Sequence, residues 1–152
     1  MKLSRRKVLA LGAGFGAAAL TGLSTSGIAF ADEAATQAAI DAFAAGAEVG
    51  EGRISLTAPE IAENGNTVPI SVDVESEMTE ADHVAAVMIL ASGNPNPGVI
   101  TFNFTPMNGV AAATTRIRLA KTQDVIAVAK MSDGSVFMDK KLVKVTIGGC
   151  GG

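Results

Sequence analysis

The chain has 152 residues, of which 48% are hydrophobic and 18% are charged, with a formal net charge of −3. This length suggests one domain, and the lack of a basic excess argues against a nucleic-acid partner. With one Cys and one His, the chain cannot form an intramolecular disulfide or close a four-ligand zinc site from these residue types. A catalytic site that needs histidine would have to use His83, so the composition argues against most self-sufficient enzymes.

Residues 1–31 have the order of a secretory signal peptide. Basic residues near the start precede an uncharged, glycine-rich apolar stretch, which ends at the small-residue pattern Ala29-Phe30-Ala31. This order predicts cleavage after Ala31, and the pair Arg5-Arg6 predicts the twin-arginine route, which exports folded proteins. A membrane anchor is the alternative, but the glycines and the cleavage pattern argue against it. We expect a periplasmic protein that is free of the membrane after cleavage, with a mature charge of 8 − 15 = −7.

The mature chain is predicted to begin with a short helix and to continue as strands. In residues 34–46 the helical period places apolar side chains near one side, namely Ala38, Ile40, Phe43 and Ala47. Alternating or short apolar runs then predict about seven strands, at 53–56, 67–74, 83–90, 99–104, 112–119, 124–130 and 136–147. No helix of crossover length separates them, so we expect one all-β domain over 32–147, an antiparallel, immunoglobulin-like β-sandwich.

Local signals refine this expectation. The alternation in 67–74 places four side chains on one buried face, namely Val68, Ile70, Val72 and Val74. Pro69 within that run suggests an edge strand or a strand start. Residues 92–98 are predicted to form a loop and 132–134 a hairpin turn. Arg116 and Arg118 are expected to point outward from their strand into solvent.

The residues that carry chemistry stand at the end of the chain, in Gly148-Gly149-Cys150-Gly151-Gly152. Four glycines supply no side chains that could bury the thiol, and they make the segment thin and flexible. We therefore predict that 148–152 is a mobile arm, which extends roughly 10 Å past Ile147 and carries the thiol of Cys150 into a narrow site on another protein. No metal and no cofactor are expected.

The sequence around Cys150 provides no group that would activate the thiol. No Lys, Arg or His lies within five residues of it, and Lys144 is the nearest basic residue upstream. A thiol of ordinary pKa, about 8.5, is mostly protonated at neutral pH, so activation must come from a partner enzyme. The chain is thus predicted to be a covalent carrier and not an enzyme.

Two other functions remain open at this stage. In the first, the carboxylate of Gly152 would become a thiocarboxylate, which requires ATP-dependent adenylation and conflicts with export. In the second, the protein is a structural, adhesin-like sandwich whose Cys150 only forms an intermolecular disulfide. His83 is expected to be a surface or capping residue rather than a ligand or base.

The terminal pentapeptide resembles the GGCGG ending of the SoxY family, the sulfur-carrier subunits of bacterial thiosulfate oxidation. Four internal segments are also similar to that family: Asn66-x-Val68-Pro69-Ile70, 78–84, Asn94-Pro95-x-Pro97 and 115–120. The resemblance covers the chain from near Ala34 to Gly152, and the pentapeptide is its most specific part.

The resemblance implies partners and a reaction cycle. A SoxZ-like β-sandwich subunit would form a heterodimer with this chain. A c-type haem enzyme, SoxXA-like, would join thiosulfate oxidatively to Cys150, and a di-manganese, SoxB-like hydrolase would release sulfate. A molybdenum–haem, SoxCD-like dehydrogenase would oxidise the remaining sulfane sulfur. All intermediates would stay covalently bound to Cys150.

Overall fold

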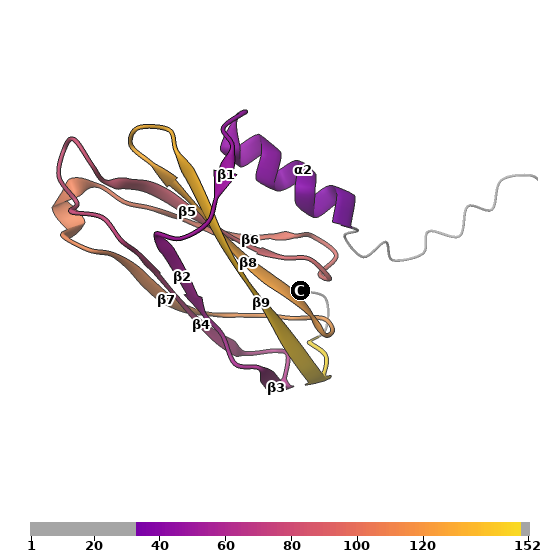
Figure 1. The fold of residues 1–152 in the computed structure, drawn as a ribbon. Helices are drawn as coiled ribbons and strands as arrows, with labels where there is room; N and C mark the ends of the chain where they lie inside the picture. The colour runs from indigo at the N-terminus through magenta and orange to yellow at the C-terminus, as the bar shows by residue number, and fades with distance from the viewer. Residues whose placement is uncertain (1–32, 150–152) are drawn as a thin grey trace, which may run out of the picture.

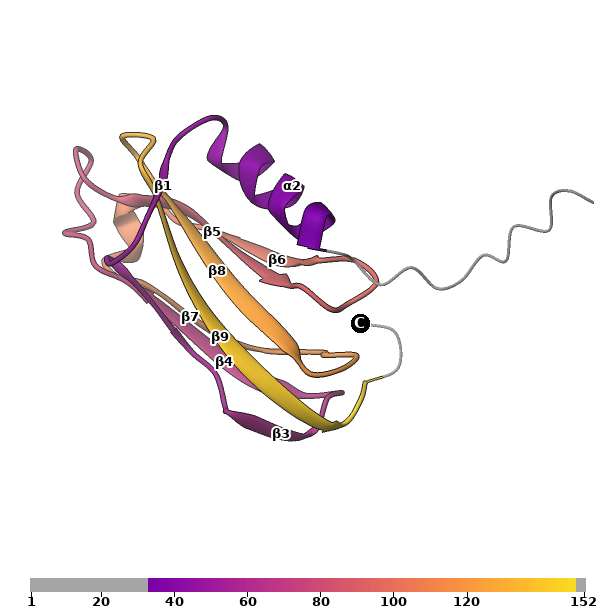
Figure 2. The same cartoon turned by 45° about the vertical axis from the view of Figure 1, so that its right-hand side comes forward.

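A computed structural model describes residues 33–149, which form two β-sheets packed face to face, with one helix on the outer face of the larger sheet (Figure 1; Figure 2). The larger sheet has the order β1-β9-β8-β5-β6, with β3 also paired to β9, and the smaller sheet has the order β2-β4-β7. The elements are α2 (Glu33–Ala44), β1 (Val49–Gly50), β2 (Ile54–Thr57), β3 (Ile61–Asn64), β4 (Val68–Val74), β5 (Val84–Ala91), β6 (Gly98–Asn103), the 3-10 helix η2 (Pro106–Asn108), β7 (Ala111–Ile117), β8 (Gln123–Met131) and β9 (Val136–Ile147). The predicted signal peptide, residues 1–31, lies outside the described residues.

The predicted helix is present as α2, and it packs on the outer face of the larger sheet (Figure 2). Ile40 and Ala44 are buried there, and Phe43 is half-buried beside them. Ala38 is exposed, so its placement on the apolar side was wrong. The helix ends where Gly46 adopts a φ of 87°, a left-handed conformation that glycine accepts without strain.

Strand β4 is confirmed with its predicted face. Its burial alternates, so that the side chains of Val68, Ile70, Val72 and Val74 all enter the core between the sheets. The edge position suggested by Pro69 was wrong, because β4 lies between β2 and β7. Pro69 is nevertheless near the start of the strand. Strand β2 pairs only with Ser71 to Val74 of β4, so the missing amide of Pro69 does not interrupt the ladder between β2 and β4.

The main core lies between the two sheets, and a second apolar cluster lies under α2. Strand β8 contributes to both, because Val125, Ala127 and Ala129 face the smaller sheet while Ile126 and Val128 face the helix. A strand that is buried on both faces has a nearly continuous run of apolar residues in its sequence, and β8 has such a run. Within residues 33–149, no helix is long and apolar enough to cross a membrane.

The predicted β-sandwich with a short N-terminal helix is confirmed, but it is not entirely antiparallel. Strands β1 and β3 were not predicted, and both pair in parallel with β9. Each is short, with two and four residues, and neither shows the alternation that identifies a half-buried strand. Strand β3 matters for function because it pairs with the last residues of β9, from Lys144 to Ile147.

The hairpin turn predicted at 132–134 joins β8 to β9. Gly134 has a φ of 88°, and the Asp133 carboxylate accepts hydrogen bonds from the backbone and the hydroxyl of Ser135, at 2.8 and 2.6 Å. These hydrogen bonds hold the pKa of Asp133 below its ordinary value. The turn chemistry therefore agrees with the hairpin that the sequence predicts.

Candidate functional site

After β9 the chain passes between the turn that contains Gly65 and the loop that contains Leu119, and three backbone hydrogen bonds hold it there. The Gly65 amide donates to the Ile147 carbonyl at 2.7 Å, and the Leu119 amide donates to the Gly65 carbonyl at 2.8 Å. The Gly149 amide then donates to the Leu119 carbonyl at 2.9 Å. We call this set, made by Gly65, Leu119, Ile147 and Gly149, the tail clamp. It fixes the residue that immediately precedes Cys150.

Glycine is needed in the tail clamp because backbones approach closely. A Cβ on Gly65 would overlap the carbonyl oxygen of Leu119, and a Cβ on Gly148 would overlap that of Ala120. A Cβ on Gly149 would lie 2.8 Å from the Gly65 carbonyl oxygen. The colliding groups are backbone atoms, which cannot rotate aside as a side chain does. A side chain at any of these positions would therefore force the turns apart.

The contacts refine the predicted arm of residues 148–152. Gly148 packs against the Ala120 carbonyl, and Gly149 is buried and hydrogen-bonded, so both are held by the body of the protein. Cys150, Gly151 and Gly152 lie outside the described residues, and the motion of the arm stays a prediction. In the described structure the chain is in contact with the body of the protein as far as Gly149.

Two buried amides support the loop that holds the tail. Asn94 is 2% exposed and Gln123 is 5% exposed. The Asn94 side chain donates to the Arg118 carbonyl at 2.8 Å and accepts from the Ala120 amide at 3.0 Å. Gln123 donates to Asn94 at 2.9 Å, and its own oxygen accepts from the Gly93 amide at 2.7 Å. Since buried amides of this kind are costly when unsatisfied, the network fixes the position of the loop on both sides of Leu119.

Sequence reasoning missed this network, although a signal was present. Three of the segments that resemble the SoxY family meet at this end of the sandwich. Asn66 follows Gly65, Asn94 opens the second segment, and 115–120 contains Leu119. These segments are far apart in the sequence, and the fold brings them together around Gly149. The fourth segment, 78–84, does not join them.

His83 lies at the opposite end of β5 from Asn94. Its Nδ1 is 3.0 Å from the Thr79 carbonyl oxygen, and its backbone bonds to Ser132. The structure therefore does not bring His83 to the tail clamp, which agrees with a capping role. Across residues 33–149, no three His, Cys, Asp or Glu side chains are grouped so that they could hold a metal ion.

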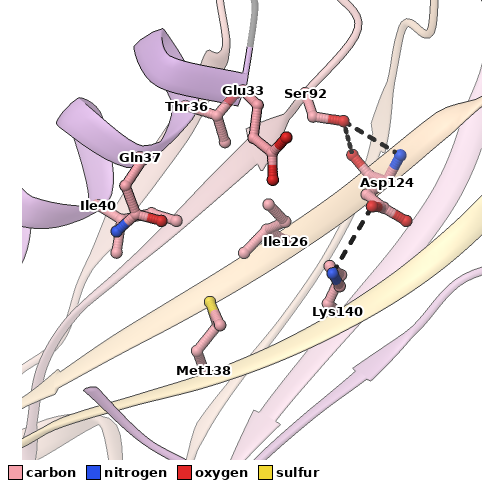
Figure 3. Close-up of a pocket in the computed structure, with 9 residues that line it drawn as sticks. All are labelled: Glu33, Thr36, Gln37, Ile40, Ser92, Asp124, Ile126, Met138 and Lys140. Carbon is pink, nitrogen blue, oxygen red and sulfur yellow. Dashed lines mark hydrogen bonds and ion pairs between the residues drawn. The ribbon is translucent and has the colours of Figure 1, made fainter.

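A separate pocket of about 330 Å³ lies between α2 and the larger sheet, as Figure 3 shows. Three of its lining residues interact with one another: Lys140 Nζ is 3.8 Å from Asp124 Oδ2, and the Ser92 hydroxyl bonds to the backbone of Asp124. Buried Thr36 at its wall has a hydroxyl oxygen with no hydrogen-bond partner among the described residues. We assign this pocket to the packing of α2.

Replacing Thr36 with Val is expected to raise the free energy of unfolding by about 1 kcal/mol, because it removes a buried hydroxyl without a partner and keeps the branched shape. Urea unfolding followed by far-ultraviolet circular dichroism measures the change. Thr146→Val, at an exposed position of β9, is the control and should change stability little. A loss of stability in Thr36→Val would contradict the expectation that the hydroxyl is an unsatisfied buried group.

The sequence model of one protein family, described as "Sulfur oxidation protein SoxY", matches residues 40–150. The chain belongs to the SoxY family. The match runs through the tail clamp and up to the position of Cys150. No curated protein matches the chain. Membership of the SoxY family supports a role as a sulfur carrier in sulfur oxidation.

Solved structures agree with this assignment. The structure of the sulfur carrier protein SoxY from Chlorobium limicola f thiosulfatophilum is 30% identical, covers 75% of this chain and 98% of its own, and has a TM-score of 0.63. A superoxide reductase (neelaredoxin) from Ignicoccus hospitalis is 19% identical, with 62% and 80% coverage and a TM-score of 0.55. A putative superoxide reductase from Thermotoga maritima is 19% identical, with 68% and 89% coverage and a TM-score of 0.52. The last two show a shared fold alone.

Proposed function

We propose that this SoxY-family protein is a periplasmic carrier whose Cys150 holds thiosulfate-derived sulfur while partner enzymes act on it. The observation that carries the proposal is the tail clamp, which holds Gly149 at one end of the sandwich. Cys150, the only thiol in the sequence, is the next residue. A fixed base followed by a short glycine-flanked segment would present the thiol to other proteins, because glycines supply no side chains that could bury it.

The atoms and electrons of each step balance if the partner enzymes are of the classes that the family resemblance implies. The Cys150 thiol and thiosulfate join through a new S–S bond, which releases a proton and two electrons to a c-type haem enzyme. Water then cleaves the bond between the sulfane and sulfonate sulfurs at a di-manganese hydrolase, which leaves a persulfide on Cys150 and releases sulfate. A molybdenum–haem dehydrogenase would accept the electrons when the remaining sulfane sulfur is oxidised with oxygen from water.

The carrier thiol is the substrate of these reactions and not a catalyst. The basic residue nearest to it in sequence is Lys144, which lies on β9 before the tail clamp. A protein that is handed between enzymes gains from a thiol of low intrinsic reactivity, because activation then occurs only inside the receiving site. The mature charge of 8 − 15 = −7 would attract the carrier to basic docking faces.

Intact mass measured on protein from the native periplasm tests this function. We expect a chain that begins at Asp32 and carries sulfur adducts, which reductant removes and which map to the peptide that contains Cys150. Protein that retains Met1 and is found in the cytoplasm would contradict the location. Disulfide-linked dimers without sulfur adducts would favour the structural, adhesin-like alternative.

The arm after Gly149 is tested by Gly151→Val. The branched side chain beside the thiol would widen and stiffen the segment, so turnover by the partner enzymes should fall. The rate of alkylation of Cys150 by iodoacetamide should stay within about twofold, because a small reagent needs no narrow entrance. Equal losses in both assays would show instead that the glycines tune the thiol. Gly149→Val is unsuitable here, because Gly149 packs in the tail clamp.

We also propose a SoxZ-like β-sandwich as the partner subunit in a heterodimer. Ile61 of β3 pairs with Lys144 of β9, and this register places Ile61 on the same face as Leu142. Both large aliphatic side chains are exposed on this face, and apolar side chains grouped on a surface mark contact sites. Co-purification followed by light scattering should give a heterodimer, which Ile61→Ser with Leu142→Ser weakens. A stable monomer at micromolar concentration would contradict this partnership.

A further inference from the structure

A hollow of about 270 Å³ lies beside β7, on the side of the sandwich where the edge strands β6 and β7 face each other. Its walls include Arg116, Arg118, Asn96 and Val99. The volume greatly exceeds the roughly 30 Å³ of one water molecule, so a small solute fits. The hollow does not overlap the pocket under α2.

The two guanidinium groups are available for a ligand. Both arginines are exposed, and neither makes an ion pair or a side-chain hydrogen bond with any residue in the range 33–149. The residue paired with Arg116 across the sheet is Pro69, which has no charge and no amide donor. No Asp or Glu lines the hollow. In a chain with an acidic excess, this makes a localised positive site.

An amide adds a neutral donor to the site. The oxygen of the Asn96 side chain accepts from the Gly98 amide at 3.2 Å, which turns the loop and leaves the side-chain NH₂ group as a donor. Guanidinium and amide groups are the donors that bind the oxygens of a tetrahedral oxyanion, since arginine binds such groups with paired hydrogen bonds.

The hollow is built into the same loop as the tail clamp. The Arg118 carbonyl is held by Asn94 at 2.8 Å, and the next residue, Leu119, holds the Gly149 amide at 2.9 Å. A sulfonate that is attached through sulfur to Cys150 starts one residue beyond Gly149, a step of about 3.8 Å along the chain. The network around Asn94 thus positions both the arginines and the base of the arm.

We propose that Arg116, Arg118 and Asn96 form a binding site for the sulfonate group of a sulfur oxyanion. The sulfonate belongs either to free thiosulfate or to the thiosulfonate that is attached to Cys150, and the second source rests on the proposed function. In either case the site neutralises the negative charge that the sulfur species brings to an acidic protein.

Free thiosulfate is tested first, on ¹⁵N-labelled Cys150→Ser protein at constant ionic strength. The backbone signals of Asn96 and Val99 and the side-chain N–H signals of Arg116 and Arg118 should shift and saturate, with a dissociation constant on the order of 1 mM. Arg116→Gln with Arg118→Gln should weaken binding at least about tenfold. Lys141→Gln with Lys144→Gln removes the same charge from β9 and should leave binding unchanged. The Cys150→Ser protein used throughout this experiment lacks the thiol, so the result does not depend on the carrier function.

The attached sulfonate is tested on the native sequence after reaction with tetrathionate and removal of the released thiosulfate and the excess tetrathionate by desalting. The Cys150 thiolate displaces thiosulfate from tetrathionate and keeps a thiosulfonate, so atoms and charge balance. If the attached group occupies the hollow, the same signals shift without added thiosulfate. If they shift only with added thiosulfate, the free anion is the ligand. Absence of a saturable shift in both experiments, an equal response to chloride, or a response only to an acidic peptide would overturn the site.

Discussion

Replacing Cys150 with Ser is expected to abolish every reductant-labile mass adduct and to leave the free energy of unfolding within about 0.5 kcal/mol of the parent. The loss should be complete because the sequence contains no other Cys. The stability should be unaffected because the core between the sheets and the cluster under α2 are built from residues before Ile147. Intact mass after treatment with tetrathionate, with and without reductant, gives the first result, and urea unfolding gives the second.

The control for Cys150→Ser is Met107→Ser. Met107 is 96% exposed, so its substitution removes an accessible sulfur atom that is not a thiol. This variant should still acquire the full adduct. A Cys150→Ser protein that still gained sulfur would refute the carrier function, and one that unfolded would show that the thiol has a structural role instead.

Replacing Gly65 with Ala is expected to lower the free energy of unfolding by about 3 kcal/mol and to release Gly149 from the body of the protein. The added Cβ would overlap the Leu119 carbonyl oxygen and lie 2.7 Å from the Gly149 amide nitrogen. Both groups are backbone atoms in the tail clamp, so relief requires the two turns to separate and the three hydrogen bonds to weaken. Circular dichroism is the suitable probe of unfolding, because the sequence has no Trp or Tyr.

Hydrogen exchange shows where the Gly65→Ala effect acts. The amides of Leu119 and Gly149 should exchange faster, while those in the middle of β8 keep their protection. Turnover by partner enzymes should fall, and alkylation of Cys150 by iodoacetamide should not. Asn66→Ala, which changes an exposed side chain in the same turn, is the control and should have little effect. Unchanged exchange at Gly149 in Gly65→Ala would mean that the tail clamp does not position the arm.

The sequence by itself determined most of the sandwich. Alternation over the seven residues of β4, and over Arg116 to Leu119 at the end of β7, reports which face of a strand is buried, and that information is local. The hairpin turn at 132–134 is also local, because Gly134 and Asp133 carry its geometry. The presence of a lone thiol among glycines likewise needs no structure to be recognised.

Other features depended on partners that are distant in the sequence. Strands β1 and β3 are too short to show a period, and they exist as strands because β9 lies beside them. The side of β8 that carries Ile126 is buried because α2 covers it. Pro69 was predicted to mark an edge strand or a strand start, and it lies at the start of a central strand, because a local pattern does not reveal how far a neighbouring strand extends.

The glycines near the arm show most clearly what a local sequence pattern does not reveal. Local reasoning assigns glycine to flexibility, and this prediction for Gly151 and Gly152 stands untested. For Gly148 and Gly149 the tertiary structure shows another reason for the same residue type, namely close contact with the backbone of Ala120 and Gly65. A missing side chain permits both motion and tight packing, and only the atoms that lie opposite decide between them.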